Sequence, residues 1–154
     1  MPVYSWILIV IILAAAGIGS LLTNPDPVWY GSLIKSALNP PAWVFSPVWT
    51  LLYALLIYAA WLLGRNASEQ GIRFWFVVYL FGFNLILNGV WSYLFFTEHL
   101  LGAAMIDAVV LAVSAWLIAF LAWPINRRVT LVFLLYAGWL SFATILSYNL
   151  WQLN

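Results

Sequence analysis

Two aromatic side chains at helical spacing, Trp49 and Tyr53, are the residues best suited to hold a flat molecule. Because they are four positions apart, their rings lie on one face of a helix, one turn apart. The preceding residues 39–41, Asn-Pro-Pro, are stiff and extended, and Pro47 falls in the first helical turn, where its missing N–H costs nothing. The segment therefore predicts a rigid mount for two aromatic faces. The alternative interpretation is an aromatic belt at a membrane interface.

Polar and aromatic residues also recur at helical spacing inside two later apolar runs. The first run places these residues on one helix face: Asn84, Asn88, Trp91, Ser92 and Phe95. The second run carries a similar stripe: Tyr136, Trp139, Ala143 and Ser147. Together with the mount, the two stripes predict a shared interior that is mostly apolar and flat-faced, with few hydrogen-bonding groups. Such a lining is typical of a small-molecule pocket.

Asp107 is a carboxylate inside a further apolar run, accompanied there by Ser114 and Trp116. A charged side chain at this depth costs about 2.5–3.5 kcal/mol on insertion scales, so we expect it to face the protein interior and to have a partner. One interpretation makes Asp107 and Asn88 hydrogen-bonding contacts between helices. The other makes them functional groups of a binding or transport site.

The lining suggests a large, planar, hydrophobic ligand such as a tetrapyrrole or a sterol. Haem would require an axial ligand, but the single histidine, His99, falls in a predicted interfacial turn, and Met105 is a poor second candidate. A metal-free porphyrin held by stacking is easier to accommodate, with Lys35 as a cation for its propionates. We predict no metal site and no required cofactor, and the absence of cysteine excludes thiolate chemistry.

The composition identifies an integral membrane protein. Of 154 residues, 67% are hydrophobic and 6% are charged, whereas soluble domains are about a quarter charged. The net charge of +1 provides no basic face for nucleic acid. The lipid bilayer is therefore the expected surrounding, and the 11 tryptophans are more than an interfacial belt usually needs.

Five apolar runs are long enough to span a bilayer, which takes about 20 residues. They predict an all-α bundle, a single domain over residues 1–154, with these approximate spans: 4–22, 44–63, 74–96, 100–122 and 129–151. The first run lacks a preceding Lys or Arg and is too long for a signal peptide, so we interpret it as a retained helix. The connection from Thr23 to Trp43 is long, which is typical of a lid or binding loop.

The cations predict the orientation. The connections on the N-terminal side of the predicted bundle hold four arginines: Arg65, Arg73, Arg127 and Arg128. The opposite side has only Lys35. The positive-inside rule therefore places the N-terminus in the cytoplasm and the long first loop outside.

These residues closely resemble the TspO/MBR family, the tryptophan-rich sensory proteins, which are bacterial relatives of the mitochondrial translocator protein or peripheral-type benzodiazepine receptor. The resemblance covers the chain from its first span to Asn154. It rests most specifically on the block from Asn39 to Tyr53 and on the later Asn88-Gly89-Val90-Trp91-Ser92, Asp107 and Trp139. The chain departs from the family after Lys35, where Ser36 replaces the usual Pro and Leu38 the usual Trp. These departures predict a looser loop over the pocket.

The resemblance implies a five-helix membrane bundle, often a homodimer, in the bacterial inner membrane. It implies protoporphyrin IX as the ligand, with cholesterol and benzodiazepine-type drugs in some members. Carried over to this chain, the predicted ligand-binding residues are Tyr30, Trp49, Tyr53, Asn88, Trp91, Trp139, Ala143 and Ser147. The resemblance also ties Trp49 and Trp139 to light- and oxygen-dependent porphyrin degradation, so they are the candidate catalytic residues.

Three functions remain open from the sequence. The first is a porphyrin-binding sensor, regulator or photodegrading protein. The second is a carrier or translocator of cholesterol or another lipid. The family's C-terminal cholesterol pattern is incomplete here, because Gln152 stands where it needs a basic residue. The third is a transporter of small solutes organised around Asp107.

Overall fold

The computed structural model describes residues 2–22, 27–65 and 71–154, without the side chains of 18–20, 22 and 27. Residues 23–26, where the predicted lid begins, and 66–70, in the predicted second connection, lie outside this part. The elements in chain order are α1 (Val3–Leu22), α2 (Pro27–Ser32), the 3₁₀ turn η1 (Ala42–Val44), α3 (Phe45–Arg65), α4 (Ile72–Ser92), the π-helical turn η2 (Tyr93–Thr97), α5 (Leu101–Ala122) and α6 (Arg127–Leu153).

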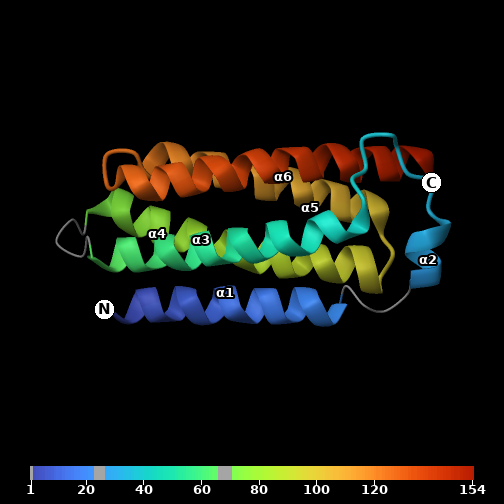
Figure 1. Ribbon diagram of the computed structural model, residues 1–154. Coiled ribbons are helices and arrows are strands. Elements are labelled where there is room, and N and C mark those ends of the chain that lie inside the picture. The colour runs from blue at the N-terminus through green and yellow to red at the C-terminus, as the bar shows by residue number, and fades with distance from the viewer. Residues whose placement is uncertain (1, 23–26, 66–70) are drawn as a thin grey trace.

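The prediction of an all-α membrane protein is confirmed for the described residues. Four helical segments are long and apolar enough to cross a bilayer, namely Ala42–Arg65, Ile72–Thr97, Leu101–Ala122 and Arg127–Leu153. A shorter apolar helical stretch, Val3–Gly17, is described within α1. The long helices lie side by side, with the two termini at opposite ends of the bundle (Figure 1).

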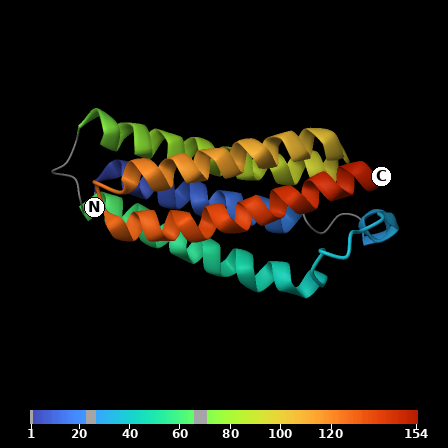
Figure 2. The ribbon, with the colours of Figure 1, turned by 90° about the horizontal axis from the view of Figure 1, so that it is seen from above.

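The short helix α2 was not predicted from the sequence. It lies beyond the end of the bundle, beside the C-terminus, in both views (Figures 1 and 2). A six-residue helix has no apolar period long enough to detect, and tertiary contacts stabilise it. It carries Trp29 and Tyr30, which line a cavity together with residues of α3 and α4.

The start of α3 follows the chemistry of its prolines. Pro41 is extended, with φ −54° and ψ 142°, and it precedes the single turn η1. The α-helix then begins at Phe45, so that Pro47 lies in the first turn as predicted. The prolines therefore fix where the helix starts and in which direction Trp49 and Tyr53 project.

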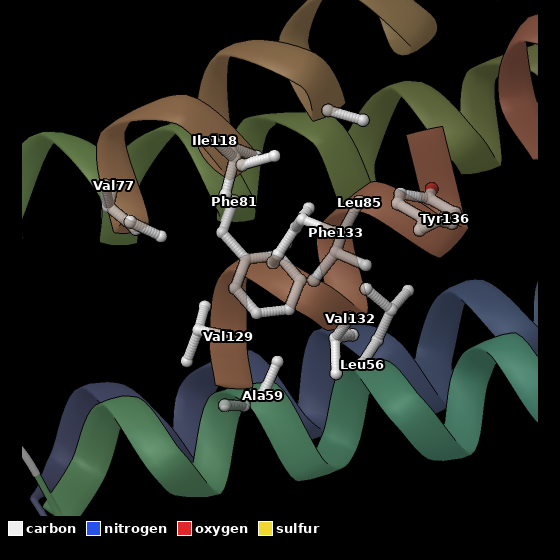
Figure 3. Close-up of a cluster of buried hydrophobic side chains, with 14 of the residues drawn as sticks. Leu56, Ala59, Val77, Phe81, Leu85, Ile118, Val129, Val132, Phe133 and Tyr136 are labelled. Atoms are coloured by element: carbon white, nitrogen blue, oxygen red, sulfur yellow. The ribbon is translucent and has the colours of Figure 1, made fainter. Parts of the chain in front are cut away.

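The core lies at the end of the bundle away from α2, where α1, α3, α4, α5 and α6 all contribute side chains. Phe81 and Phe133 meet edge to face, with ring centroids 4.9 Å apart, and Leu56 and Val132 pack beside them (Figure 3). Tyr136, at the edge of this cluster, is fully buried and carries a hydroxyl. The packed core therefore ends on a polar group.

Small residues allow the closest helix contacts, as expected in a membrane, where packing rather than the hydrophobic effect drives helix association. The α5 face toward the bundle is rich in buried alanines, including Ala104, Ala115 and Ala122. At Gly64 an added Cβ atom would clash with the Ser5 side chain, so glycine permits this close approach of α3 to α1.

Candidate functional site

A cavity of about 600 Å³ opens between α2, α3, α4 and α6, above the packed core. The lining includes all eight residues predicted to bind ligand: Tyr30, Trp49, Tyr53, Asn88, Trp91, Trp139, Ala143 and Ser147. The sequence analysis did not identify several other lining residues: Trp29, Asn39, Phe45, Ser46, Thr50 and Phe96. The volume falls within the range of roughly 300–1,000 Å³ that is usual for small-molecule sites.

The wall contributed by α3 consists of aromatic rings one turn apart. Trp49 and Tyr53 have ring centroids 5.6 Å apart and are tilted by 31°, which agrees with the predicted mount. One turn earlier, Phe45 meets Trp139 of α6 edge to face at 6.1 Å. The two candidate catalytic tryptophans thus line one cavity from different helices.

The wall contributed by α4 is also aromatic. Trp91 and Phe95 are stacked, with centroids 4.9 Å apart and planes inclined by 12°. Phe95 lies in the π-helical turn η2, where the wider backbone winding changes the face that each side chain presents. A strict 3.6-residue repeat does not predict this turn, so the position of Phe96 in the lining was not anticipated.

The floor of the cavity is a connected chain of hydrogen bonds. The Tyr53 hydroxyl donates to Asn88 Oδ1 at 2.7 Å, and Asn88 Nδ2 donates to the Tyr136 hydroxyl at 3.3 Å. The Tyr136 hydroxyl donates to Asn84 Oδ1 at 3.0 Å, and Asn84 Nδ2 donates to Ser114 Oγ at 2.7 Å. The chain joins α3, α4, α6 and α5, so it fixes the aromatic walls relative to each other.

The mouth of the cavity is covered by the segment that contains α2. Trp29 and Tyr30 both contact Phe95 edge to face, at 5.4 and 6.3 Å. His99, predicted to be a solvated loop residue, is exposed but also stacks on Trp29, with centroids 3.8 Å apart. These ring contacts attach the covering segment to the α4–α5 end of the bundle.

Polar contacts attach the other end of the covering segment to α6. Asn154 accepts a hydrogen bond from the Ile34 N–H at 2.9 Å and donates one to the Ile34 carbonyl at 3.1 Å. Asn149 Nδ2 donates to Ser36 Oγ at 3.3 Å. Ser36, which stands where the family usually has Pro, therefore provides one of the attachments of this segment.

Lys35, predicted as the cation for a porphyrin's propionates, lies beside Tyr30 in its own loop. Its ammonium lies 4.4 Å from the centroid of the Tyr30 ring and donates to the carbonyl oxygens of Tyr30 and Leu33. It is absent from the cavity lining, and none of the lining residues among the described part of the chain is charged. The polar capacity of the cavity therefore comes from amides, hydroxyls and indole N–H groups.

Asp107 is buried, as predicted, but the expected interhelical partner is not observed. Within the described residues its Oδ2 is buried without a hydrogen-bond partner. Its neighbour Ala108 lines the cavity, whereas Asp107 does not. Two threonine hydroxyls make polar contacts between α5 and α6, with Thr144 Oγ1 donating to the Ala108 carbonyl at 3.0 Å and Thr130 Oγ1 to the Ala119 carbonyl at 3.2 Å. These hydroxyls satisfy backbone carbonyls rather than the carboxylate.

The long apolar helices and the aromatic cavity between them define a class: an integral membrane protein with a helical bundle and an internal cavity lined by aromatic residues. The sequence profile of the TspO/MBR family matches residues 6–152. This chain belongs to the TspO/MBR family.

Relatives occur in bacteria, archaea and animals. The tryptophan-rich protein TspO of Chlorobaculum tepidum is 33% identical, over 92% of this chain and 90% of its own length. The tryptophan-rich protein TspO of Archaeoglobus fulgidus is 33% identical, over 95% and 94%. The translocator protein of Ovis aries is 31% identical, over 82% and 75%. Similarity over nearly the whole chain extends to every element that lines the cavity.

Proposed function

We propose that this protein binds a porphyrin, with protoporphyrin IX as the ligand, in the cavity between α2, α3, α4 and α6. The observation that supports this proposal is the set of flat aromatic faces on both sides of a cavity of about 600 Å³. Offset stacking on such faces contributes about 0.5–1.5 kcal/mol per ring pair beyond burial, and a planar macrocycle can use several at once.

The uncharged lining determines how a porphyrin would be oriented. Ionised propionates would be costly to bury against apolar walls without a cation. We therefore place the macrocycle between the aromatic walls and its propionates toward the mouth, where Asn39, Ser46 and Thr50 line the cavity. The Tyr53–Asn88 pair at the floor would face the apolar edge of the ring system.

We also propose that the protein degrades the bound porphyrin under light, which would make it an enzyme as well as a binding protein. An excited porphyrin passes energy to dioxygen or takes an electron from an electron-rich indole. Trp49 and Trp139 line the same cavity, so both would lie against the bound macrocycle. Among the cavity-lining residues described here there is no carboxylate, lysine or histidine to act as a general base. The protein would therefore contribute positioning and a redox-active wall.

The alternative functions receive less support. A sterol would fit the apolar lining but would not use paired aromatic faces. A solute transporter organised around Asp107 would need this carboxylate to face the cavity, and it is not part of the lining. We further propose five membrane spans, because α1 continues the apolar pattern. We also propose that the N-terminus lies in the cytoplasm of a bacterial cell, because the arginines lie at the end of the bundle where α1 starts.

Titration of protoporphyrin IX into the purified protein in lipid nanodiscs tests the proposed function. The expected result is a red-shifted Soret band that saturates at one porphyrin per chain. A spectrum equal to that of porphyrin in empty nanodiscs would contradict the proposal.

A further inference from the structure

A second recess lies on the lipid-facing side of the bundle, between α3 and α6. It has a volume of about 520 Å³ and is formed by Val48 to Leu55 on α3 and by Leu134 to Phe142 on α6. Leu51 and Leu135, on its two sides, are 60% and 63% exposed. Both stretches belong to helices that can cross a bilayer, so this groove opens toward lipid rather than toward water.

One residue separates this groove from the cavity. Within the described part of the chain, Trp139 is the single side chain that lines both recesses. On the cavity side its ring contacts Phe45 at 6.1 Å, and on the groove side it contacts Phe142 at 5.6 Å. The wall between the binding cavity and the bilayer is therefore one indole thick at this position.

No polar contact holds that indole in place. Trp139 Nε1 is buried without a hydrogen-bond partner, whereas buried indole N–H groups usually have one. The indole is retained by apolar packing, including its ring contacts with Phe45 and Phe142, and the groove lies directly beside it. Figure 2 shows α3 and α6 spreading apart toward the end that carries α2.

The mouth under α2 would be a more costly route. Opening it would break the Asn154–Ile34 pair, the Asn149–Ser36 hydrogen bond and the stacking of Trp29 on His99. The side route would require displacement of a single ring. A planar apolar molecule also concentrates in the bilayer because of its hydrophobicity. The bilayer is the medium that the groove contacts.

We infer that the groove between α3 and α6 is a lateral entrance from the bilayer to the cavity, with Trp139 as its gate. The inference rests on the proposed function, because the molecule that passes is the planar apolar ligand of the cavity. It adds a route and a gating residue to that site.

Gly138 provides a specific test. It lines the groove and not the cavity, and a Cβ atom placed on it meets nothing within 4 Å. Gly138→Phe should fill the groove without changing the binding surface. Blocking a route slows passage in both directions equally, so protoporphyrin IX association and dissociation should both slow by about tenfold or more while the Kd stays within about twofold.

The measurement is stopped-flow transfer of protoporphyrin IX from loaded vesicles to full-length protein in nanodiscs. Gly138→Ala controls for the change of backbone residue. Gly17→Phe, at another exposed glycine with open space around it, controls for an added ring on the lipid face. Both controls should keep the wild-type rates. If Gly138→Phe does not fold, Leu51→Trp narrows the groove from the α3 side and should give the same slowing.

The outcomes separate the two proposals. If the wild-type protein binds no protoporphyrin IX at equilibrium, the proposed function is wrong, and the proposal of a lateral entrance is wrong as well. If the wild type binds but the groove variants keep its rates, only the entrance is wrong. A weaker Kd with an unchanged association rate would also overturn the entrance, because the groove would then be part of the bound state or the seat of a lipid chain.

Discussion

The Tyr53 hydroxyl donates a 2.7 Å hydrogen bond to Asn88 Oδ1 and so joins α3 to α4 at the floor of the cavity. Asn88 donates a hydrogen bond to the Tyr136 hydroxyl, which in turn donates one to Asn84. In a membrane these groups have no water to replace a lost partner, so each depends on the next. The floor therefore supports both the packing of the bundle and the shape of the site.

Tyr53→Phe should lower the stability of the folded protein by about 1 kcal/mol, because it leaves Asn88 Oδ1 without its donor. The Phe ring keeps the contact with Trp49, so porphyrin affinity should fall only a few-fold. A thermal-unfolding series in detergent measures the first effect and a Soret titration the second. Tyr58→Phe, on an exposed ring of the same helix, is the matched control and should behave as wild type.

Asn154→Ala should loosen the covering segment, because it removes both hydrogen bonds to Ile34. Hydrogen exchange over residues 27–43 should be faster in this variant, and bound protoporphyrin IX should slow it again. Gln152→Ala, two residues earlier on α6 and exposed, serves as control. Equal exchange in wild type and variant, with and without porphyrin, would show that this segment is not a lid.

Asp107→Asn should leave the melting temperature unchanged or raise it. One of the two interpretations from the sequence made Asp107 a polar contact between helices, whose loss would be destabilising. The buried Oδ2 has no partner, however, so a neutral amide of the same shape removes the cost of burying charge. A clear drop in melting temperature would indicate a partner that forms only in the membrane. A large loss of porphyrin affinity in a folded Asn variant would place Asp107 in the site.

Trp49→Phe and Trp139→Phe should retain most porphyrin binding, because phenyl rings still stack, but should lose light-dependent bleaching of the bound porphyrin. The measurement is the decay of the Soret band under illumination in air, compared with an anaerobic sample. Trp116→Phe, an exposed tryptophan on α5, should bleach at the wild-type rate. If all three variants bleach like wild type, the cavity indoles only bind, and the protein has no photochemical activity of this kind.

Much of the fold was predictable because apolar runs of membrane-spanning length and their prolines are local signals. Helix α3 begins at Phe45, one residue from the predicted start of that span. The face shared by Asn84, Asn88 and Trp91 was also predictable, since helical period alone places these residues together. The same helical period predicted that Trp139, Ala143 and Ser147 share one face of α6.

The features that escaped prediction depend on contacts between distant segments or on irregular backbone. Helix α2 is too short to carry a periodic signal, and the π-helical turn at Tyr93–Thr97 breaks the regular period. The missing partner of Asp107 could not be inferred, because a carboxylate in an apolar run predicts burial but not geometry. The contacts of Lys35 with Tyr30 and Leu33 could not be predicted either, because they depend on how that loop folds.

The most direct test of the account fills the cavity from within. Ala143 lines the cavity between Trp139 and Ser147 on α6, so Ala143→Trp would place an indole where the porphyrin is proposed to lie. Val113→Trp adds the same ring to an exposed position on α5, at 61% exposure, and serves as control. The measurement is protoporphyrin IX affinity in nanodiscs, with melting temperature and helical circular dichroism to show that each variant is folded. The account predicts that Ala143→Trp abolishes the Soret shift while Val113→Trp binds like wild type; wild-type affinity in a folded Ala143→Trp variant would contradict it.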